Sequence, residues 1–371
     1  MEAEAEIPEE AKPPRMNRRQ WKAARGNRED KWTRKDRLLL EANAEKRREQ
    51  EAAEAAADAA AEAANKEDPE AAIATRYRES WIQIFSRSHG SYEDATSIPP
   101  MRYTHEPPPP YTRVGYADSV VIFSVKVTQV NQCLEWPLDV YGVVAARDSV
   151  DRNRNLIFNR TRDNCQTLTP EDASLSLTGP TRAIVIIDPV NYEVELKVKG
   201  DTPSQDKFLS LLLIEDKYYA SGEPCHGVHC HTYSSKLSTV ELTIGHLAQT
   251  VEATITFQVI EGSWPTHHHG RFVAHMPHLN DLEMVLLDSR DGMVSVMSDG
   301  VIELSRCVVP VEADGELKLW VDAWQGNDQA DFVGKDQVTF APRKAGRSED
   351  TCDVGFCKMR VNVVWSLVVN W

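Results

Sequence analysis

The residue types best suited to hold a metal ion are concentrated in one stretch, CHGVHCH, which begins at Cys225 and ends at His231. Cysteine thiolates and histidine nitrogens are the ligands that zinc prefers in proteins. The cysteines here are spaced C-x4-C and the first two histidines H-x2-H, whereas zinc sites commonly use C-x2-C or H-x3-H pairs. We therefore interpret the stretch as a variable polar loop and predict no metal site.

A metal site remains an alternative, because other residues in the chain could supply further ligands. Further histidines and a cysteine pair could supply distant ligands: His267, His268, His269, His275, His278, Cys352 and Cys357. No second pair follows the first at a standard ligand spacing. A metal-dependent hydrolase built on these residues is our third functional hypothesis, and elemental analysis would test it.

A second chemically suggestive group lies in residues 136–168, where the pattern predicts a strand, a charged turn, a short strand and another charged turn. The turns contain arginine and aspartate but neither lysine nor glutamate: Arg147, Asp148, Asp151, Arg152, Arg154, Arg160, Arg162 and Asp163. Such residues favour two-pronged ion pairs. The predicted pairs join Arg154, Arg160 and Arg162 to Asp148, Asp151 and Asp163. The alternative is that the arginines bind phosphate oxygens, for example those of RNA.

Signatures of common enzyme classes are absent from the sequence. It contains no G-x-S-x-G motif, no Walker loop and no dinucleotide-binding glycine pattern between a strand and a helix. Scattered aspartates and glutamates could form a carboxylate pair, but the sequence does not place two of them in one pocket. We therefore predict no catalytic residue and no cofactor, and we favour a protein without enzymatic activity.

The elements expected to position these residues are β-strands. Apolar and polar residues alternate in five stretches, 121–127, 192–198, 251–259, 317–321 and 359–367. Residues 183–187 and 208–214 are apolar throughout, which predicts buried strands, the first of them central in its sheet. Since no long helical period follows residue 112, we predict an all-β fold, an antiparallel β-sandwich or barrel-like domain, at residues 118–371. A division into two sandwich halves near residues 219–235 stays open.

The segment before this domain differs in composition. Residues 11–48 hold 14 Lys and Arg against 5 Asp and Glu, so this part carries +9 and the rest of a chain with net charge -15 carries -24. Residues 41–66 are rich in alanine, which predicts local helix or coiled coil, but they contain few large apolar residues. We therefore predict a charged, partly helical or disordered extension at residues 1–75. A Pro-rich lead-in segment follows at residues 76–117, with a short helix or anchor near Trp81 and a stiff proline connector.

The basic part of the extension offers an alternative to a solvated arm. Trp21, Trp32 and Leu39 fall on one helical face among basic residues, a pattern that also fits a helix for RNA, a membrane surface or a partner. The net charge argues against nucleic-acid binding by the whole molecule. Seven cysteines without a secretory signal predict reduced thiols and a cytoplasmic or nuclear location, and no apolar run reaches the roughly 18 residues of a membrane span.

Several blocks of the sequence are similar to those of a known family. They are WPLDVYGVVAARDSVDRNRNLIFNRTRDNCQTLT, LTGPTRAIVIIDPVNYEVELKVKG, VEATI and CDVGFCKMRVNVVWSL, with SWIQIFSRSHGSYEDATSIPPMRYT before them. Together they resemble a cereal plant family of unknown function, found alone with charged N-terminal extensions or fused to ribosome-inactivating domains. The resemblance implies a setting in defence or stress, and it supplies no catalytic residues. Glu252 in VEATI lacks the Glu-Ala-x-x-Arg helix pattern of the ribosome-inactivating active site.

We therefore expect a non-enzymatic interaction or regulatory module that acts in stress or defence on an unidentified protein partner. The alternative is an RNA- or ribosome-associated accessory factor that uses the basic segment 11–48. Salt separates the two hypotheses, because contacts to phosphate weaken steeply as salt rises.

Overall fold

The computed structural model describes most of the chain after residue 67 and short pieces before it. The described residues are 18–20, 42–43, 45–50, 52–53, 68–105, 114–216, 226–279, 282–290, 292–325 and 332–370. The chain divides into two compact units, Met1–Asp68 and Pro69–Trp371. The described pieces of the first unit are helical, and Trp21, Trp32 and Leu39 lie outside the described residues.

The second unit is mostly β-structure with antiparallel pairing, which confirms the predicted fold class, and its described sheets form no closed barrel. Its strands are β1 (Val114–Gly115), β2 (Ala117–Val130), β3 (Leu138–Arg147), β4 (Asn155–Arg160), β5 (Gln166–Leu168), β6 (Ile184–Val185), β7 (Asn191–Val198), β8 (Lys207–Glu215), β9 (Gly227–Ser234), β10 (Ser238–Gly262), β11 (His268–His275), β12 (Glu283–Asp288), β13 (Val308–Glu312), β14 (Leu317–Gln325), β15 (Phe332–Phe340), β16 (Gly346–Asp353), β17 (Cys357–Ser366) and β18 (Val369–Asn370). Short 3-10 helices lie at Arg162–Asn164, Pro203–Gln205 and Pro277–Leu279.

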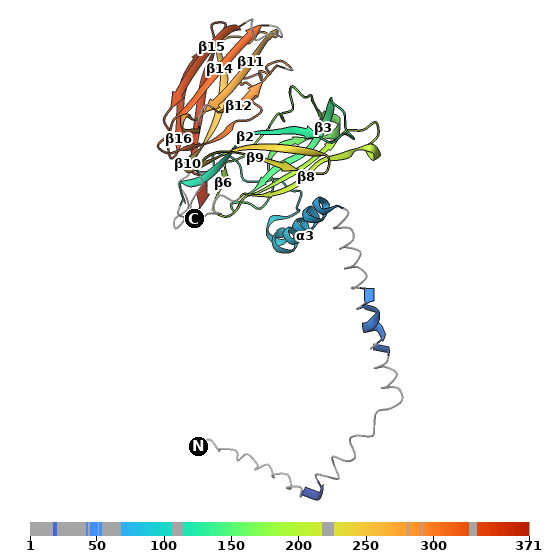
Figure 1. The fold of residues 1–371 in the computed structure, drawn as a ribbon. Helices are drawn as coiled ribbons and strands as arrows, with labels where there is room; N and C mark the ends of the chain where they lie inside the picture. Colours follow the sequence, from blue (N-terminus) through green and yellow to red (C-terminus); the bar gives the residue numbers. More distant parts are fainter. Residues whose placement is uncertain are drawn as a thin grey trace, which may run out of the picture. The chain divides into compact units, whose positions relative to one another are not determined.

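A long helix, α3 (Pro69–His89), precedes the strands and packs against β8 (Figure 1). Proline begins it, an acidic residue lies in its first turn and basic residues lie in its last, as the helix dipole favours. It ends before Gly90, whose φ of 84° suits the left-handed conformation that follows many helices. The expected boundary between residues 75 and 76 falls inside this helix.

The strands build two sandwiches that share one sheet. Among the described residues this sheet has seven strands, and both β2 and β10 run through it. The first half of β10 lies between β2 and β9, and its second half between β13 and β17. The sheet β4-β3-β7-β8, with β5 beside β3, belongs to the first sandwich, and the sheet β12-β11-β14-β15 belongs to the second. Figure 1 shows the second sandwich in orange and red beside the green strands of the first.

Strand β10 changes the core that it faces along its length. Val240 and Ile244 belong to the first apolar cluster, whereas Leu247 and Val251 belong to the second. The change lies between Ile244 and Leu247, where the core-facing side chains pass from even-numbered to odd-numbered positions. The two cores therefore divide within a continuous strand, beyond the region near residues 219–235 where the sequence left a division open.

The strand at residues 184–185 corrects one expectation about sheet position. We predicted residues 183–187 as central because they are apolar throughout, but β6 lies at the end of the strand order and pairs only with β2 among the described strands. Ile184 belongs to the first core, and Val185 packs with Ala117 and Val368 in a small separate cluster. Covering segments bury this strand, so its apolar character does not report a central position.

Candidate functional site

The charged turn after β3 makes ion pairs, but not the predicted ones. Arg147 and Arg154 both donate to the carboxylate of Glu193, with a distance of 3.0 Å from Nη2 of Arg147 and of 3.0 Å from Nε of Arg154. Glu193 lies on β7, opposite Ala145 of β3. The predicted pairing of Arg154 with an aspartate of the same turns is therefore wrong, because the neighbouring strand supplies a better-placed carboxylate.

The other predicted pairs are wrong as well. Asp148 accepts two hydrogen bonds from Arg182, at 2.7 and 2.8 Å, and both side chains are buried. Asp151 accepts a hydrogen bond from Thr96. Arg162 donates to Asp206 at 2.9 Å, and this pair holds the pKa of the Asp206 carboxyl well below its usual range, together with a hydrogen bond from Tyr141.

The remaining two predicted residues take no part in these pairs. Asp163 is exposed, and Nε of Arg160 is a buried donor without a partner among the described residues. Neither residue therefore supports the idea that ion pairs within the two turns fix their register.

The turn instead holds the lead-in segment against the first sandwich. Nη2 of Arg147 donates to the carbonyl of Tyr92, and its guanidinium lies 4.1 Å from the centre of that ring. Trp81, the buried residue of α3, donates from its indole nitrogen to the carbonyl of Arg152. Asn153 donates to the carbonyl of His89 at the end of the helix. Since Arg147 is 1% exposed, it is not available to phosphates in solution.

The predicted metal-ligand types do not converge in the described residues. Cys225 lies outside them, and no three His, Cys, Asp or Glu side chains among the described residues are arranged to hold a metal ion. His229 and His231 stack on β9, whereas Cys230 points to the other side, near Thr243. The remaining candidates belong to the second sandwich: His267 beside His268 just before β11, His268, His269 and His275 on β11, His278 in a 3-10 helix, and Cys352 and Cys357 in the core.

A buried polar group that sequence reasoning missed lies where β7, β8 and β10 meet. Asp216 accepts a hydrogen bond of 2.7 Å from the hydroxyl of Tyr192 and one of 2.9 Å from Nε2 of His246. Burial raises the pKa of Tyr192 far above its ordinary value, and Asp216 adds to the shift. The sequence pattern indicated that Tyr192 is a core residue, because it alternates with polar residues. Nothing in the sequence indicated that it lies near His246.

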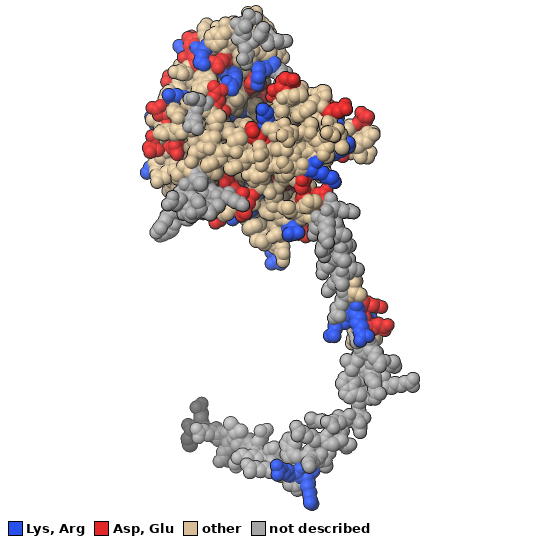
Figure 2. Space-filling model, viewed as in Figure 1, with Lys and Arg blue, Asp and Glu red and all other residues tan. Residues whose placement is uncertain are grey.

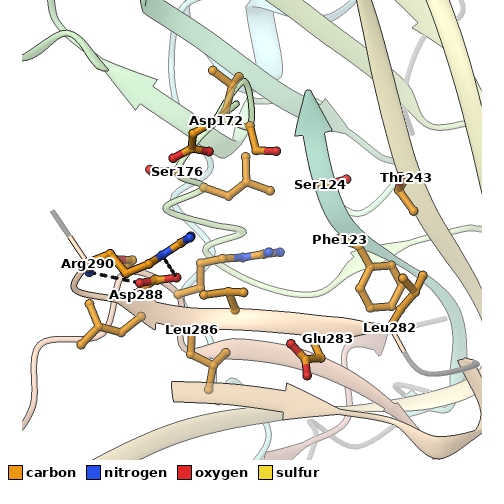
Figure 3. Close-up of a pocket in the computed structure, with 17 residues that line it drawn as sticks. Phe123, Ser124, Asp172, Ser176, Thr243, Leu282, Glu283, Leu286, Asp288 and Arg290 are labelled. Atoms are coloured by element: carbon orange, nitrogen blue, oxygen red, sulfur yellow. Dashed lines mark hydrogen bonds and ion pairs between the residues drawn. The ribbon is translucent and has the colours of Figure 1, made fainter. Parts of the chain in front are cut away.

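A cleft between the two sandwiches combines depth with accessible polar groups (Figure 3). Its volume is about 370 Å³. It is lined by Phe123 and Ser124 of β2, Thr243 of β10, Asp172, Ser174, Leu175, Ser176, Leu177, Leu282, Glu283, Val285, Leu286, Leu287, Asp288, Arg290, Ser305 and Arg306. Figure 3 shows Asp172 and Ser176 facing Glu283 and Leu286 across the cleft. Leucines from both cores contribute apolar surface, Leu175 and Leu177 from the first and Leu286 from the second.

Arg306 is the most deeply buried charged group of this cleft. It is 3% exposed, and it donates from Nε to the carbonyl of Gly179 at 2.6 Å and from Nη2 to the carbonyl of Ile122 at 2.8 Å. Within the described residues, no carboxylate forms an ion pair with it and Nη1 has no hydrogen-bond partner. Burial lowers the pKa of Arg306 to about 9, so the group still carries its positive charge at pH 7.

Two backbone features position this arginine. The amide of Arg306 donates to the carbonyl of Leu286 on β12, so the residue is attached to the second sandwich. Its acceptor Gly179 sits against the first, where a Cβ would lie 1.7 Å from the carbonyl oxygen of Leu156 and any larger residue would displace the chain. The guanidinium thus spans the two sandwiches at the wall of the cleft.

The acidic residues of the cleft are largely engaged by cations at its mouth. Glu283 pairs with Arg271 at 2.6 Å, and Asp288 pairs with Arg290 at 2.9 Å, the interaction dashed in Figure 3. Asp172 is exposed. On the face drawn in Figure 2, Lys and Arg are interspersed with Asp and Glu and form no continuous basic surface.

In the described part of the chain, no helix has both the length and the apolar character of a transmembrane span. Comparison with solved structures finds human GIVD cytosolic phospholipase A2, with 10% identity and a TM-score of 0.26 over 69% of this chain and 31% of that one. It also finds the two C2 domains of Extended-Synaptotagmin 2, with 9% identity and a TM-score of 0.24 over 74% of this chain and 100% of that one. Likeness at this level carries no functional information.

The comparison with sequence families is more specific. No protein in the curated set matches this chain. The model of a family described as a domain of unknown function, DUF6598, matches residues 119–363 and so spans both sandwiches. This match confirms the expected resemblance to a domain of unknown function, and the chain belongs to the DUF6598 family.

Proposed function

We propose that this chain is a non-enzymatic binding module that holds a small ligand in the cleft between its two sandwiches. The observation that carries the proposal is the cleft itself, because its volume of about 370 Å³ falls in the range of small-molecule sites. Both sandwiches form its walls, so a bound ligand would contact both. A regulatory module requires such a coupling between ligand and fold.

The chemistry of the cleft favours binding over catalysis. Neither histidine nor cysteine lies among its described lining residues, so the serine hydroxyls there have no imidazole to act as a general base. Glu283 and Asp288 are engaged in ion pairs with arginines. These features suit a site that recognises a molecule and releases it unchanged.

A cleft-filling variant tests this function. Ser176 is exposed and lines the cleft, so Ser176→Trp should fill it without disturbing either core. Ser298 is exposed in a turn outside the cleft, and Ser298→Trp is the matched control. In a ligand-observed NMR screen of small fragments, the wild type and the control should bind a common set that Ser176→Trp loses. If all three chains bind the same fragments, the cleft is not the site.

The setting that we propose is the cytoplasm or nucleus of a grass cell under stress or attack. It rests on the sequence resemblance and on free thiols at the described cysteines, as expected in a reducing compartment. Recovery of partners from stressed and unstressed grass tissue, with the wild type and Ser176→Trp as baits, tests it. A partner that depends on both stress and an open cleft would support the setting, and recovery independent of both would contradict it.

A second candidate function uses the basic segment instead of the cleft. Residues 11–48 carry +9, which favours RNA or ribosome association. If the segment binds RNA, its deletion should abolish RNA retention, and each lost phosphate contact should reduce the slope of log affinity against log salt by about 0.7–0.9. Retention that survives the deletion, or that salt does not affect, would exclude this segment.

A further inference from the structure

We propose that the ligand of the cleft carries an oxyanion, a carboxylate or a phosphate group, which pairs with Arg306 while its apolar body lies against the leucines of the two cores. This inference rests on the proposed binding function and names the chemical class of the ligand.

Arg306 has no counter-charge among the described residues. A charged group removed from water is costly unless an opposite charge or several hydrogen bonds compensate it. The other deeply buried arginines have such partners, since Arg147 and Arg154 share Glu193 and Arg182 pairs with Asp148. Arg306 has two carbonyls and, within the described residues, no carboxylate. An oxyanion in the cleft would supply the charge that the described fold does not.

The guanidinium of Arg306 is held in a fixed orientation at the wall of the cleft. Nε and Nη2 are directed to the carbonyls of Gly179 and Ile122, which fixes the plane of the group. Nη1 is left without a described partner, and Arg306 lines the cleft. The two N–H groups of Nη1 in a rigid, charged group therefore remain for a ligand, and hydrogen bonds between charged partners are about twice as strong as neutral ones.

The remaining polar lining fits the same ligand class. Hydroxyl groups suited to donate to an oxyanion come from both walls and from the shared strand β2: Ser124, Ser174, Ser176 and Ser305. Arg290 adds a second cation at the mouth, although it is partly neutralised by Asp288. The acids Asp172 and Glu283 oppose an anion there, so the oxyanion must enter deeply enough to reach Arg306.

Three probes of similar shape separate the charge from the rest of the ligand. Benzoate and phenyl phosphate carry the two oxyanions, and benzamide is the neutral counterpart of benzoate. Binding to the full chain is measured by titration NMR at pH 7 in a buffer without other carboxylates or phosphates. At least one anion should bind about tenfold more tightly than benzamide, as a charge-assisted hydrogen bond predicts. Which anion binds better decides between a carboxylate and a phosphate.

Variants then assign the preference to Arg306. Arg306→Met should abolish the difference between anion and benzamide, whereas Arg306→Lys should retain part of it. If Arg306→Met does not fold, the loss of anion binding in Ser176→Trp and its persistence in Ser298→Trp place the anion in the cleft. Equal binding of benzamide and both anions would overturn the oxyanion while leaving the binding function intact. Anion binding that survives both Arg306→Met and Ser176→Trp, or no binding of either anion at millimolar concentration, would also overturn it.

Discussion

The arginines beneath α3 and the arginine of the cleft are equally buried but differently compensated. Arg147 and Arg154 converge on the carboxylate of Glu193, and aromatic rings surround them. Arg306 is held by the peptide carbonyls of two separate segments. In the first arrangement two guanidinium groups share one buried carboxylate, with the half-exposed Glu195 3.9 Å from Arg154, and the group attaches the lead-in helix to the sandwich. The second leaves a positive charge at the wall of a cleft.

The difference indicates which group contributes to stability and which is available for binding. Removing one member of a compensated pair leaves the other charged and desolvated, so such pairs are sensitive to mutation. Removing an uncompensated charge also removes its desolvation penalty, so the fold loses less.

The largest effect is expected for Glu193→Gln. The substitution leaves Arg147 and Arg154 buried without a carboxylate, and breaking a buried pair of this kind costs about 3–5 kcal/mol of unfolding free energy. Glu195→Gln on the same strand is the control, because Glu195 is more exposed and 3.9 Å from Arg154, and should cost under about 1 kcal/mol. Urea unfolding measures both, and equal midpoints would show that Glu193 does not compensate the pair.

A smaller loss is expected for Arg154→Lys. Arg154 binds both oxygens of Glu193 through Nε and Nη2, and an ammonium can occupy only one of these positions, so we expect a loss of about 2 kcal/mol. Arg160→Lys is the matched control at the far end of β4, the strand that follows Arg154; no described carboxylate pairs with Arg160, and the midpoint should hardly change. Tolerance of lysine at both positions would mean that the planar guanidinium is not needed beneath α3.

Arg306→Met should be milder still. The variant loses two hydrogen bonds to carbonyls but also a buried, unpaired charge, so the net cost should be near 1 kcal/mol or less. Thermal unfolding of the ligand-free chain measures it. A loss as large as that of Glu193→Gln would mean that the cleft arginine is chiefly structural, and that Arg306 does not differ in this respect from Arg147 and Arg154.

The smallest effect concerns Glu252, a buried anion held by amides just as Arg306 is a buried cation held by carbonyls. Its carboxylate accepts hydrogen bonds from the amides of Met101 and Ala183, both at 2.8 Å. Burial raises the pKa of Glu252 above 4.5, so the folded chain binds this proton more tightly than the unfolded chain. Its stabilising contribution is therefore complete below pH 4.5 and is lost as the pH rises through the folded pKa.

The pH dependence can be isolated with Glu252→Gln, which keeps the neutral shape at every pH. The wild type should lose stability relative to this variant as the pH rises above 4.5. Glu303→Gln, at an exposed position, should follow the wild type throughout. A difference between wild type and Glu252→Gln that does not change with pH would contradict the raised pKa.

The alternation of apolar residues predicted where strands lie, but it did not predict which core their side chains face. Residues 121–127 form part of β2 as expected, but Val121 and Phe123 face the second core whereas Val125 and Val127 face the first. The pairing with β10 shifts at Phe123, and one extra residue reverses the faces of a strand. Period-2 patterning reports that a strand is half buried, and it contains no information about such a shift.

Polar strands escaped prediction for a related reason. Gly346–Asp353 forms β16 although its sequence, GRSEDTCD, shows no apolar alternation, because it lies at the end of the shared sheet and is largely exposed. Glu193 shows the reverse case, a residue that the sequence pattern predicts to be exposed but that is buried. It alternates with apolar residues, as a solvent-facing position should. Helix α3, more than 100 residues earlier in the chain, covers that face and turns the glutamate into a buried partner.

The cleft could not be foreseen from local sequence at all. Arg306 lies between a serine and a cysteine with no charged pattern around it. Its acceptors, Gly179 and Ile122, are 127 and 184 residues away in the chain. Only the tertiary fold shows that this arginine donates its hydrogen bonds to carbonyl groups, whereas the other deeply buried arginines pair with carboxylates.

The shared strands β2 and β10 have a consequence for how the unit can be divided. A cut within β10 would remove a strand from both sandwiches, and unpaired neighbours on either side would expose apolar surface and open sheet edges. Neither half can therefore be excised as an autonomous domain, and the unit should melt in one cooperative transition. Insertions and deletions in the family should accordingly accumulate in the turns, and recombination should exchange the unit whole.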